Sequence, residues 1–158
     1  MLSAFAYLIR YTSMSKLRRW QIPGEVYHVS IRAWKKLPIL NGETANIIAQ
    51  EILRLVDCDG TCIFSWVVMP THVHLLVQPK DGQIGRIIQL IKGRSSRFIR
   101  KSNPSVGEIW EKRYHDRRLR HSSEISEIDE YIIMNPVRAG LCKSPEDWPW
   151  SSIHRKWE

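Results

Sequence analysis

Hydrophobic and polar residues alternate along residues 69–78 with the period of two that is typical of a β-strand. His72, His74 and Leu76 occupy one set of positions, and Val73, Leu75 and Val77 occupy the other. Because successive side chains of a strand point to opposite faces, one face is aliphatic and the other carries two imidazoles. The pattern predicts a strand that buries one face in a core and presents the histidine pair on the other.

Alternation, which is typical of strands, and helical spacing divide most of the chain into further elements. Alternating or β-rich segments predict three more strands, at residues 25–33, 62–68 and 110–119. Apolar residues at helical spacing predict a helix over residues 44–56. A second helix is predicted from an apolar stripe at six positions: Ile84, Ile87, Ile88, Ile91, Ser95 and Phe98.

A third helix is predicted after the fourth strand. Pro136 and Gly140 are expected to end it. Tyr131 and Asn135 are four residues apart and therefore lie on one face of this helix. Three serines near its start are suited to N-cap positions: Ser122, Ser123 and Ser126.

The order strand, helix, strand, strand, helix, strand is that of the ferredoxin-like split βαβ fold, βαββαβ. We therefore predict an α+β domain whose antiparallel sheet has the third strand between the first and the second, with both helices on one face. His72 and His74 then face the open side, with His28 of the first strand close to them. The additional C-terminal helix is expected to pack on this open face and to bring Tyr131 and Asn135 to the histidines.

The length of 158 residues fits one domain, which we assign to residues 16–158, after a loose N-terminal extension at residues 1–15. Lys and Arg number 24 against 16 Asp and Glu, and the net charge of +8 favours a polyanionic partner, nucleic acid before membrane. Charge that serves only solubility is the alternative. Three cysteines make no disulfide framework, and no apolar run reaches the roughly 20 residues that span a bilayer. We expect a cytosolic protein with reduced thiols.

Basic residues gather in segments that are candidates for contact with nucleic acid. Several are interleaved with aromatic residues, which suits single-stranded nucleic acid because its phosphates pair with cations and its bases stack on rings. A solvated surface is the alternative interpretation. The candidates lie in an N-terminal arm, on the second helix and along the fourth strand: Lys16, Arg18, Arg19, Arg94, Arg97, Arg100, Lys112, Arg113, Arg117 and Arg118.

The histidine pair and the third helix carry the candidate chemistry. His-x-His on a strand is a compact pair of nitrogen ligands for a divalent metal ion. Asn135 can supply an oxygen ligand, and Tyr131 can supply a nucleophile. The spacing leaves two alternatives open, which are unrelated polar residues on a solvated face and a core tyrosine whose hydroxyl reaches the surface.

Two longer segments resemble the single-tyrosine HUH transposases and, among these, the REP-associated tyrosine transposases. Residues 69–77 are Met-Pro-Thr-His-Val-His-Leu-Leu-Val, with a hydrophobic residue between the histidines. Residues 131–141 are Tyr-Ile-Ile-Met-Asn-Pro-Val-Arg-Ala-Gly-Leu, and this string is the more specific of the two. Shorter matches extend the resemblance over residues 16–153: residues 27–30, 109–114 and 147–152.

The resemblance implies a metal-dependent endonuclease and strand transferase that acts on single-stranded or hairpin DNA of palindromic repeats. Tyr131 is implied as the nucleophile that forms a 5′-phosphotyrosine, and His72, His74 and Asn135 as ligands of Mg²⁺ or Mn²⁺. The basic segments are then the DNA surface, and His28 is a neighbour of the site. The resemblance also implies a prokaryotic, cytoplasmic and nucleoid-associated protein, either a monomer or a homodimer in which Tyr131 serves its own histidines or its partner's.

Two other interpretations fit parts of the sequence. His28-x-Ser30 and His121-x-Ser123 match the paired motifs of two-histidine phosphoesterases, which act without metal, but this leaves His72, His74 and Tyr131 without a role. A catalytically silent, RRM-like nucleic-acid-binding module has the same element order, but it needs exposed aromatic residues on its central strands. This chain has imidazoles at those positions.

Overall fold

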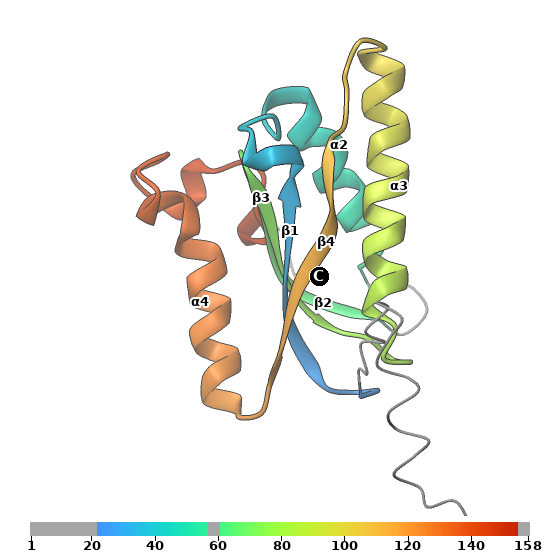
Figure 1. Ribbon diagram of the computed structural model, residues 1–158. Coiled ribbons are helices and arrows are strands. Elements are labelled where there is room, and N and C mark those ends of the chain that lie inside the picture. Colours follow the sequence, from blue (N-terminus) through green and yellow to red (C-terminus); the bar gives the residue numbers. More distant parts are fainter. Residues whose placement is uncertain (1–21, 57–60, 155–158) are drawn as a thin grey trace, which may run out of the picture.

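A computed structural model describes residues 22–56 and 61–154 and places an antiparallel sheet at the centre of the molecule (Figure 1). The order of the strands in this sheet is β2-β3-β1-β4, so β3 lies between β2 and β1 as predicted. Each neighbouring pair is antiparallel, which confirms the α+β, ferredoxin-like architecture. The strands are β1 (Val26–Ala33), β2 (Cys62–Met69), β3 (His72–Gln78) and β4 (Trp110–Leu119).

Helices cover both faces of the sheet within the described residues. Helices α2 (Gly42–Leu53) and α3 (Ile84–Ser102) lie on one face, and α4 (Ser122–Arg138) lies on the other (Figure 1). Three short 3₁₀ turns complete the fold: η1 (Trp34–Lys36), η2 (Pro145–Asp147) and η3 (Ser152–His154). None of the described helices is long and apolar enough to span a bilayer.

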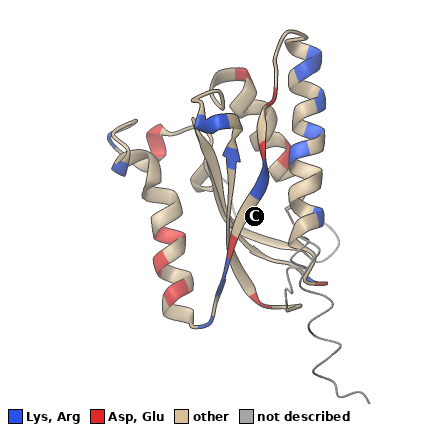
Figure 2. Ribbon diagram, viewed as in Figure 1, with Lys and Arg blue, Asp and Glu red and all other residues tan. Residues whose placement is uncertain are grey.

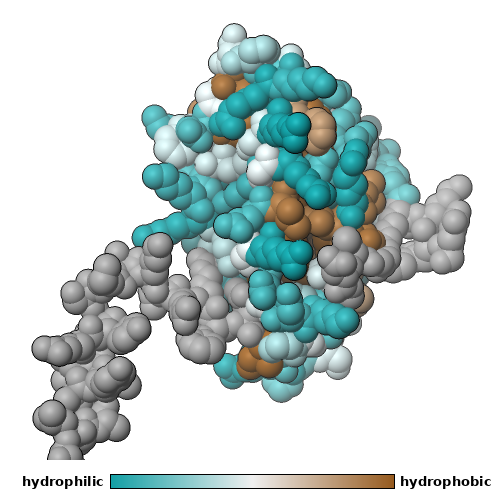
Figure 3. All heavy atoms as spheres, turned by 90° about the vertical axis from the view of Figure 1, so that its right-hand side faces the viewer, coloured by the Kyte–Doolittle hydropathy of each residue, from teal (hydrophilic) through white to brown (hydrophobic). Residues whose placement is uncertain are grey.

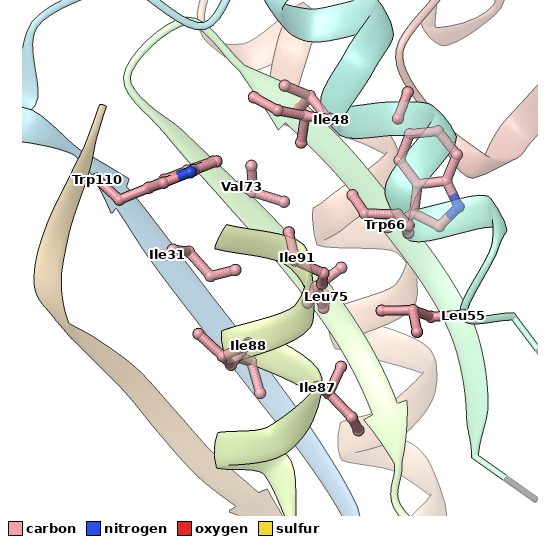
Figure 4. Close-up of a cluster of buried hydrophobic side chains, with 14 of the residues drawn as sticks. Ile31, Ile48, Leu55, Trp66, Val73, Leu75, Ile87, Ile88, Ile91 and Trp110 are labelled. Carbon is pink, nitrogen blue, oxygen red and sulfur yellow. The ribbon is translucent and has the colours of Figure 1, made fainter. Parts of the chain in front are cut away.

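The main hydrophobic core lies between the sheet and helices α2 and α3 (Figure 4). It forms because the alternating residues of β1 and β3 that point to this face are hydrophobic, as are most of the inner positions of both helices. Many of its side chains are completely excluded from solvent, among them Val29, Ile31, Leu75 and Ile91. This core holds β3 in the register that directs His72 and His74 to the opposite face.

A smaller apolar cluster fixes α4 to the other face of the sheet. Ile132 of α4 is fully buried against side chains from several strands: Val26, Val67, Met69, Leu76 and Leu119. Ile125, Ile128 and Trp148 extend this cluster at its margin. The apolar stripe of α4 therefore determines which part of the helix meets the histidine face.

Three local predictions are wrong. Phe98 is 39% exposed and Ile99 is buried instead, because the buried stripe of α3 steps by four residues after Ser95 rather than by three. Pro136 lies inside α4, which continues to Arg138; a proline this close to the end removes one helical hydrogen bond without breaking the helix. The predicted serine N-caps are not used, since α4 has His121 at its N-cap and the Glu124 carboxylate accepts a hydrogen bond from the Arg120 N–H at 2.8 Å.

The segment after α4 is attached to the outer edge of β2. The Val68 N–H donates to the Trp150 carbonyl at 2.9 Å, and the Trp148 indole N–H donates to the Val68 carbonyl at 3.0 Å. The Trp66 N–H donates to the Ser152 hydroxyl at 3.0 Å. These bonds occupy backbone groups of β2 that no other strand pairs.

Candidate active site

Three histidines meet on the face of the sheet that α4 covers. In the β1–β3 register Ser30 pairs with His74 and Arg32 with His72, so these four side chains share one face. The ring centroids of His72 and His74 are 4.6 Å apart, and those of His28 and His74 are 5.0 Å apart. The strand alternation that the sequence predicted thus produces a cluster of imidazoles and not isolated surface residues.

Hydrogen bonds engage one nitrogen of each histidine on β3. His74 Nδ1 lies 3.0 Å from His28 Nε2, and His72 Nδ1 lies 2.8 Å from the Thr71 hydroxyl. If each Nδ1 carries the proton, it donates to these partners and the Nε2 lone pairs of His72 and His74 stay available. Hydrogen bonds of this kind orient histidines that bind metal ions.

The environment of the cluster favours neutral imidazoles. Burial lowers the pKa of His74 to about 3, with smaller contributions from His72 and His28. Burial also lowers the pKa of His28, assisted by the Arg117 charge, and that of His72, assisted by Arg32. At neutral pH all three rings are therefore uncharged, which is the form that can donate a lone pair to a metal ion.

Helix α4 places Tyr131 beside the histidines of the same chain. The Tyr131 ring centroid lies 5.5 Å from that of His74 and 6.1 Å from that of His28, both in edge-on geometry. The Arg138 guanidinium carbon lies 5.6 Å from the Tyr131 ring centroid. Tyr131 is only half-buried, so its position suits a reactant better than a core residue.

An open pocket of about 310 Å³ lies where these elements converge. Asn135 is buried on α4, one turn beyond Tyr131, and is not among the residues that line this pocket. The lining comes from the end of β1, η1, the β2–β3 turn, β3 and α4: Ser30, Arg32, Lys36, Thr71, His72, His74 and Tyr131.

The donor set suits a metal ion that also binds a ligand from outside the protein. No group of three or more His, Cys, Asp or Glu side chains within the described parts of the chain is arranged to hold an ion. Two neutral imidazoles with free Nε2 atoms fit part of a coordination shell, and an amide oxygen from Asn135 is a compatible third ligand. A divalent ion with only these ligands from the protein would complete its shell with water or phosphate oxygens.

The basic residues selected from the sequence do not form a single surface. Lys16, Arg18 and Arg19 lie outside the described residues. Figure 2 shows Lys and Arg residues recurring along α3. Arg94, Arg97 and Arg100 are exposed on this helix, and Arg94 also lies 4.0 Å from the Glu51 carboxylate. The remaining four lie on β4: Lys112, Arg113, Arg117 and Arg118.

Of these four, Arg117 and Arg118 project to opposite faces of the sheet. Arg117 is directly opposite His28 on β1, and Arg118 is opposite Tyr27. Arg117 is therefore on the histidine face, whereas Arg118 is on the face of α2 and α3.

Two basic residues of the pocket were missed in the sequence. Arg32 continues the alternation of His28 and Ser30 by one step, so extending the strand pattern would have found it. Lys36 gave no such signal, because it reaches the pocket through a 3₁₀ turn with an unusual backbone conformation.

Comparison with known proteins identifies one family. The family model described as "Transposase IS200 like" matches residues 23–135. The chain is 25% identical to the REP-associated tyrosine transposase of Escherichia coli (strain K12) over 144 residues, which are 90% of this chain and 84% of that protein. It is 27% identical over 99 residues to the putative REP-associated tyrosine transposase of Haemophilus influenzae, and this match covers 56% of each chain.

Solved structures agree with this result. The structure of a REP-associated tyrosine transposase bound to a REP hairpin matches with a TM-score of 0.73 and 25% identity, covering 90% of this chain and 84% of that one. A putative transposase from Deinococcus radiodurans R1 shares the fold, with a TM-score of 0.52 and 20% identity over 75% of this chain and 94% of that one.

Proposed function

The chain belongs to the family of IS200-like transposases, and we propose that it cleaves and rejoins single-stranded DNA through a covalent bond between Tyr131 and a 5′-phosphate. The observation that carries this proposal is the position of Tyr131, whose ring centroid is 5.5 Å from that of His74 in an open pocket. The family match favours this activity over a two-histidine phosphoesterase or a silent binding module.

The reaction is a transesterification that conserves the number of phosphodiester bonds. The Tyr131 hydroxyl loses its proton and attacks phosphorus, the bond to the 3′ oxygen of the preceding nucleotide breaks, and that oxygen leaves as a 3′-hydroxyl. Attack by a 3′-hydroxyl on the phosphotyrosine reverses the exchange and joins the strands. No nucleotide cofactor is required, because the tyrosine ester stores the energy of the original bond.

The residues of the pocket divide the remaining tasks. Transposases of this family are generally metal-dependent, and His72, His74 and Asn135 are the residues that would hold Mg²⁺ or Mn²⁺ here. When bound, such an ion polarises the phosphate and offsets the negative charge that develops on it. His28 and Thr71 keep the two ligand histidines in the tautomer that exposes Nε2. Helix α4 holds Tyr131 in place through Ile132.

The substrate is proposed to be a DNA hairpin with a single-stranded flank, the ligand named for the similar solved structure. A protein with this substrate is expected to work in the cytoplasm, on the nucleoid.

The test is a covalent trapping assay with a labelled hairpin oligonucleotide in Mn²⁺, analysed on a denaturing protein gel. Wild-type protein is expected to give a labelled protein band, and Tyr131→Phe is expected to give none while it still binds the hairpin. Tyr114→Phe is the matched control, because Tyr114 lies on the opposite face of the sheet, beside α3. An adduct that persists in Tyr131→Phe and maps to Tyr27 or Tyr114 would overturn the assignment.

A further inference from the structure

Two cations face the candidate active site from the end of β1 and from the turn that follows it. Arg32 is opposite His72 in the β1–β3 register, and Lys36 belongs to η1. Both side chains line the pocket that contains Tyr131 and His74. Neither residue is part of the metal-binding or nucleophilic set described above.

The charges of Arg32 and Lys36 have no counter-charge among the described residues. Neither side chain forms an ion pair or a hydrogen bond with any residue in the described ranges, 22–56 and 61–154. Other cations of the fold are engaged: the Lys92 ammonium donates to the Glu111 carbonyl at 2.7 Å, and Arg54 lies 3.4 Å from the Glu51 carboxylate. Within the described part of the chain, the pocket therefore presents two unpaired positive charges beside Tyr131.

The backbone at Lys36 adopts a conformation that L-residues rarely use. Lys35 and Lys36 have φ values of 52° and 55°, in the left-handed region where a side chain is crowded by the backbone and glycine is favoured. Neighbouring bonds hold the turn, because the Lys35 N–H donates to the Glu111 carboxylate at 2.9 Å and the Trp34 N–H donates to the Ile109 carbonyl at 2.8 Å. Strain of this kind is found where a side chain must be presented in one place.

The two lysines of the turn have different surroundings. The Lys35 ammonium lies 5.8 Å from the centroid of the Trp34 ring, and Lys35 does not line the pocket. Lys36 does line it. The turn thus separates two adjacent lysines of equal charge, and only one of them is in reach of a ligand in the pocket.

We propose that Arg32 and Lys36 form a binding site for a backbone phosphate of the DNA strand, next to the phosphate that Tyr131 attacks. This inference rests on the function proposed above. A guanidinium can grip a phosphodiester through two parallel N–H donors, and a nearby ammonium adds a point charge. The site positions the strand for attack through its phosphate backbone and reads no base.

The test measures binding separately from cleavage. A hairpin with a fluorescent single-stranded flank is titrated in chelator with wild type, Arg32→Gln/Lys36→Gln and the control Lys35→Gln. The double variant is expected to bind at least about tenfold more weakly, since a single charge-assisted contact is worth about that factor or more. The salt slope of its affinity is expected to fall by about 0.7, the value for one phosphate contact on a single strand, because the two cations share one phosphate. Lys35→Gln is expected to match wild type.

A chemical probe locates the contact on the DNA. Replacing one phosphate of the flank at a time by an uncharged methylphosphonate is expected to weaken wild-type binding most at one position next to the cleavage site. At that position the double variant is expected to lose nothing further. Equal losses for both proteins at every position, or affinity and salt slope unchanged in the double variant, would overturn the proposal.

A glycine variant separates binding from folding. Lys36→Gly is expected to melt at the same or a higher temperature than wild type, because glycine accepts the positive φ, and yet to bind the flank more weakly. A residue with only a structural role would not produce this combination. If wild-type protein formed no adduct through Tyr131 but the binding results were as expected, the cleavage mechanism would be rejected. The phosphate site would then remain as a DNA-binding site.

Discussion

The two faces of the sheet are built from the same strands and differ in almost every physical respect. The face beneath α2 and α3 is a continuous hydrophobic core, and β3 contributes Val73, Leu75 and Val77 to it. The face beneath α4 has a smaller apolar cluster and an open pocket, and β3 contributes His72 and His74 to it. One face supplies most of the stability, and the other holds reactive groups that a close-packed core would exclude.

The comparison also shows how polar groups are tolerated at the second face. His74 is only 6% exposed, yet its Nδ1 is hydrogen-bonded to His28 and its ring is neutral. A buried polar group that keeps a hydrogen bond costs far less free energy than one that lacks a partner. The chemistry is therefore placed at the rim of the apolar cluster, where α4 leaves the pocket open.

The largest effect is expected from the histidine pair. His72→Ala or His74→Ala is expected to abolish cleavage, because each change removes a proposed metal ligand, while hairpin affinity stays within a few-fold of wild type. Cleavage is measured in Mg²⁺ with a labelled hairpin, and affinity by titration. His121→Ala is the control, since His121 is exposed at the start of α4. Normal cleavage by either pocket variant would remove the histidines from the mechanism.

The same chemical change on the two faces should separate stability from activity. Ile91→Ala and Ile132→Ala each delete a fully buried isoleucine and are expected to lower the unfolding free energy by about 2–5 kcal/mol. At a temperature where both variants are folded, only Ile132→Ala is expected to slow cleavage, because it loosens α4 beside Tyr131. Denaturant unfolding and single-turnover cleavage measure the two effects. An equal slowing of cleavage by both variants would show that packing beneath α4 matters no more for activity than packing beneath α2 and α3.

The pH dependence of stability should reveal the buried imidazole. Between its ordinary pKa of 6.5 and its folded pKa of about 3, His74 is protonated in the unfolded state and neutral in the folded one. The unfolding free energy of chelated protein therefore falls as the pH falls through this window, by up to about 1.4 kcal/mol per pH unit from this group. His28, His72 and Tyr131 face the ring and are kept unchanged.

His74→Gln is the variant that isolates this contribution. Its unfolding free energy is expected to depend less steeply on pH between pH 6.5 and pH 4 than that of wild type, when both are measured by denaturant unfolding in chelator. Identical slopes for the two proteins would show that His74 is as easily protonated in the folded state as in the unfolded chain.

The smallest effect is expected on the basic surface of α3. Neutralising Arg97 and Arg100 together is expected to reduce the salt slope of DNA affinity by about one to two units, at 0.7 to 0.9 per phosphate contact. Lys80→Gln/Lys143→Gln, which removes two exposed charges elsewhere, is the control. Figure 3 shows the side of the molecule on which α3 lies, where a patch of hydrophobic side chains is surrounded by hydrophilic ones. An unchanged slope would mark the arginines as solvated charges only.

The sequence predicted the architecture because strand alternation and helical spacing are both clear along the chain. Strict alternation in β1 and β3 and the isoleucine stripe of α3 determine which side chains are buried, and the order of elements then leaves one common topology. The meeting of Tyr131 with the histidines followed from the same reasoning, since the apolar stripe of α4 had only one uncovered face of the sheet to cover. The catalytic and metal-binding roles of these residues stay predictions.

What the sequence did not reveal depends on local backbone geometry. Lys36 enters the pocket only because two successive lysines adopt a left-handed conformation, which no hydrophobic pattern encodes. The helical period does not distinguish Phe98 from Ile99 near the end of α3, and packing against the sheet selects Ile99. The sequence predicts a helix end at Pro136, but α4 continues to Arg138, because a proline this close to the end removes one hydrogen bond without breaking the helix.

The two outer strands of the sheet bear on self-association. The edge of β2 is occupied by the segment after α4, through the Val67–Ser151 bridge and the bond from Val68 to Trp150. The edge strand β4 carries closely spaced charges instead, among them Lys112, Arg113 and Arg117. An unprotected edge invites another chain to add a strand, and both a covering segment and a row of like charges prevent this. Both edges of this sheet are thereby protected against the addition of a strand from a second copy of the chain.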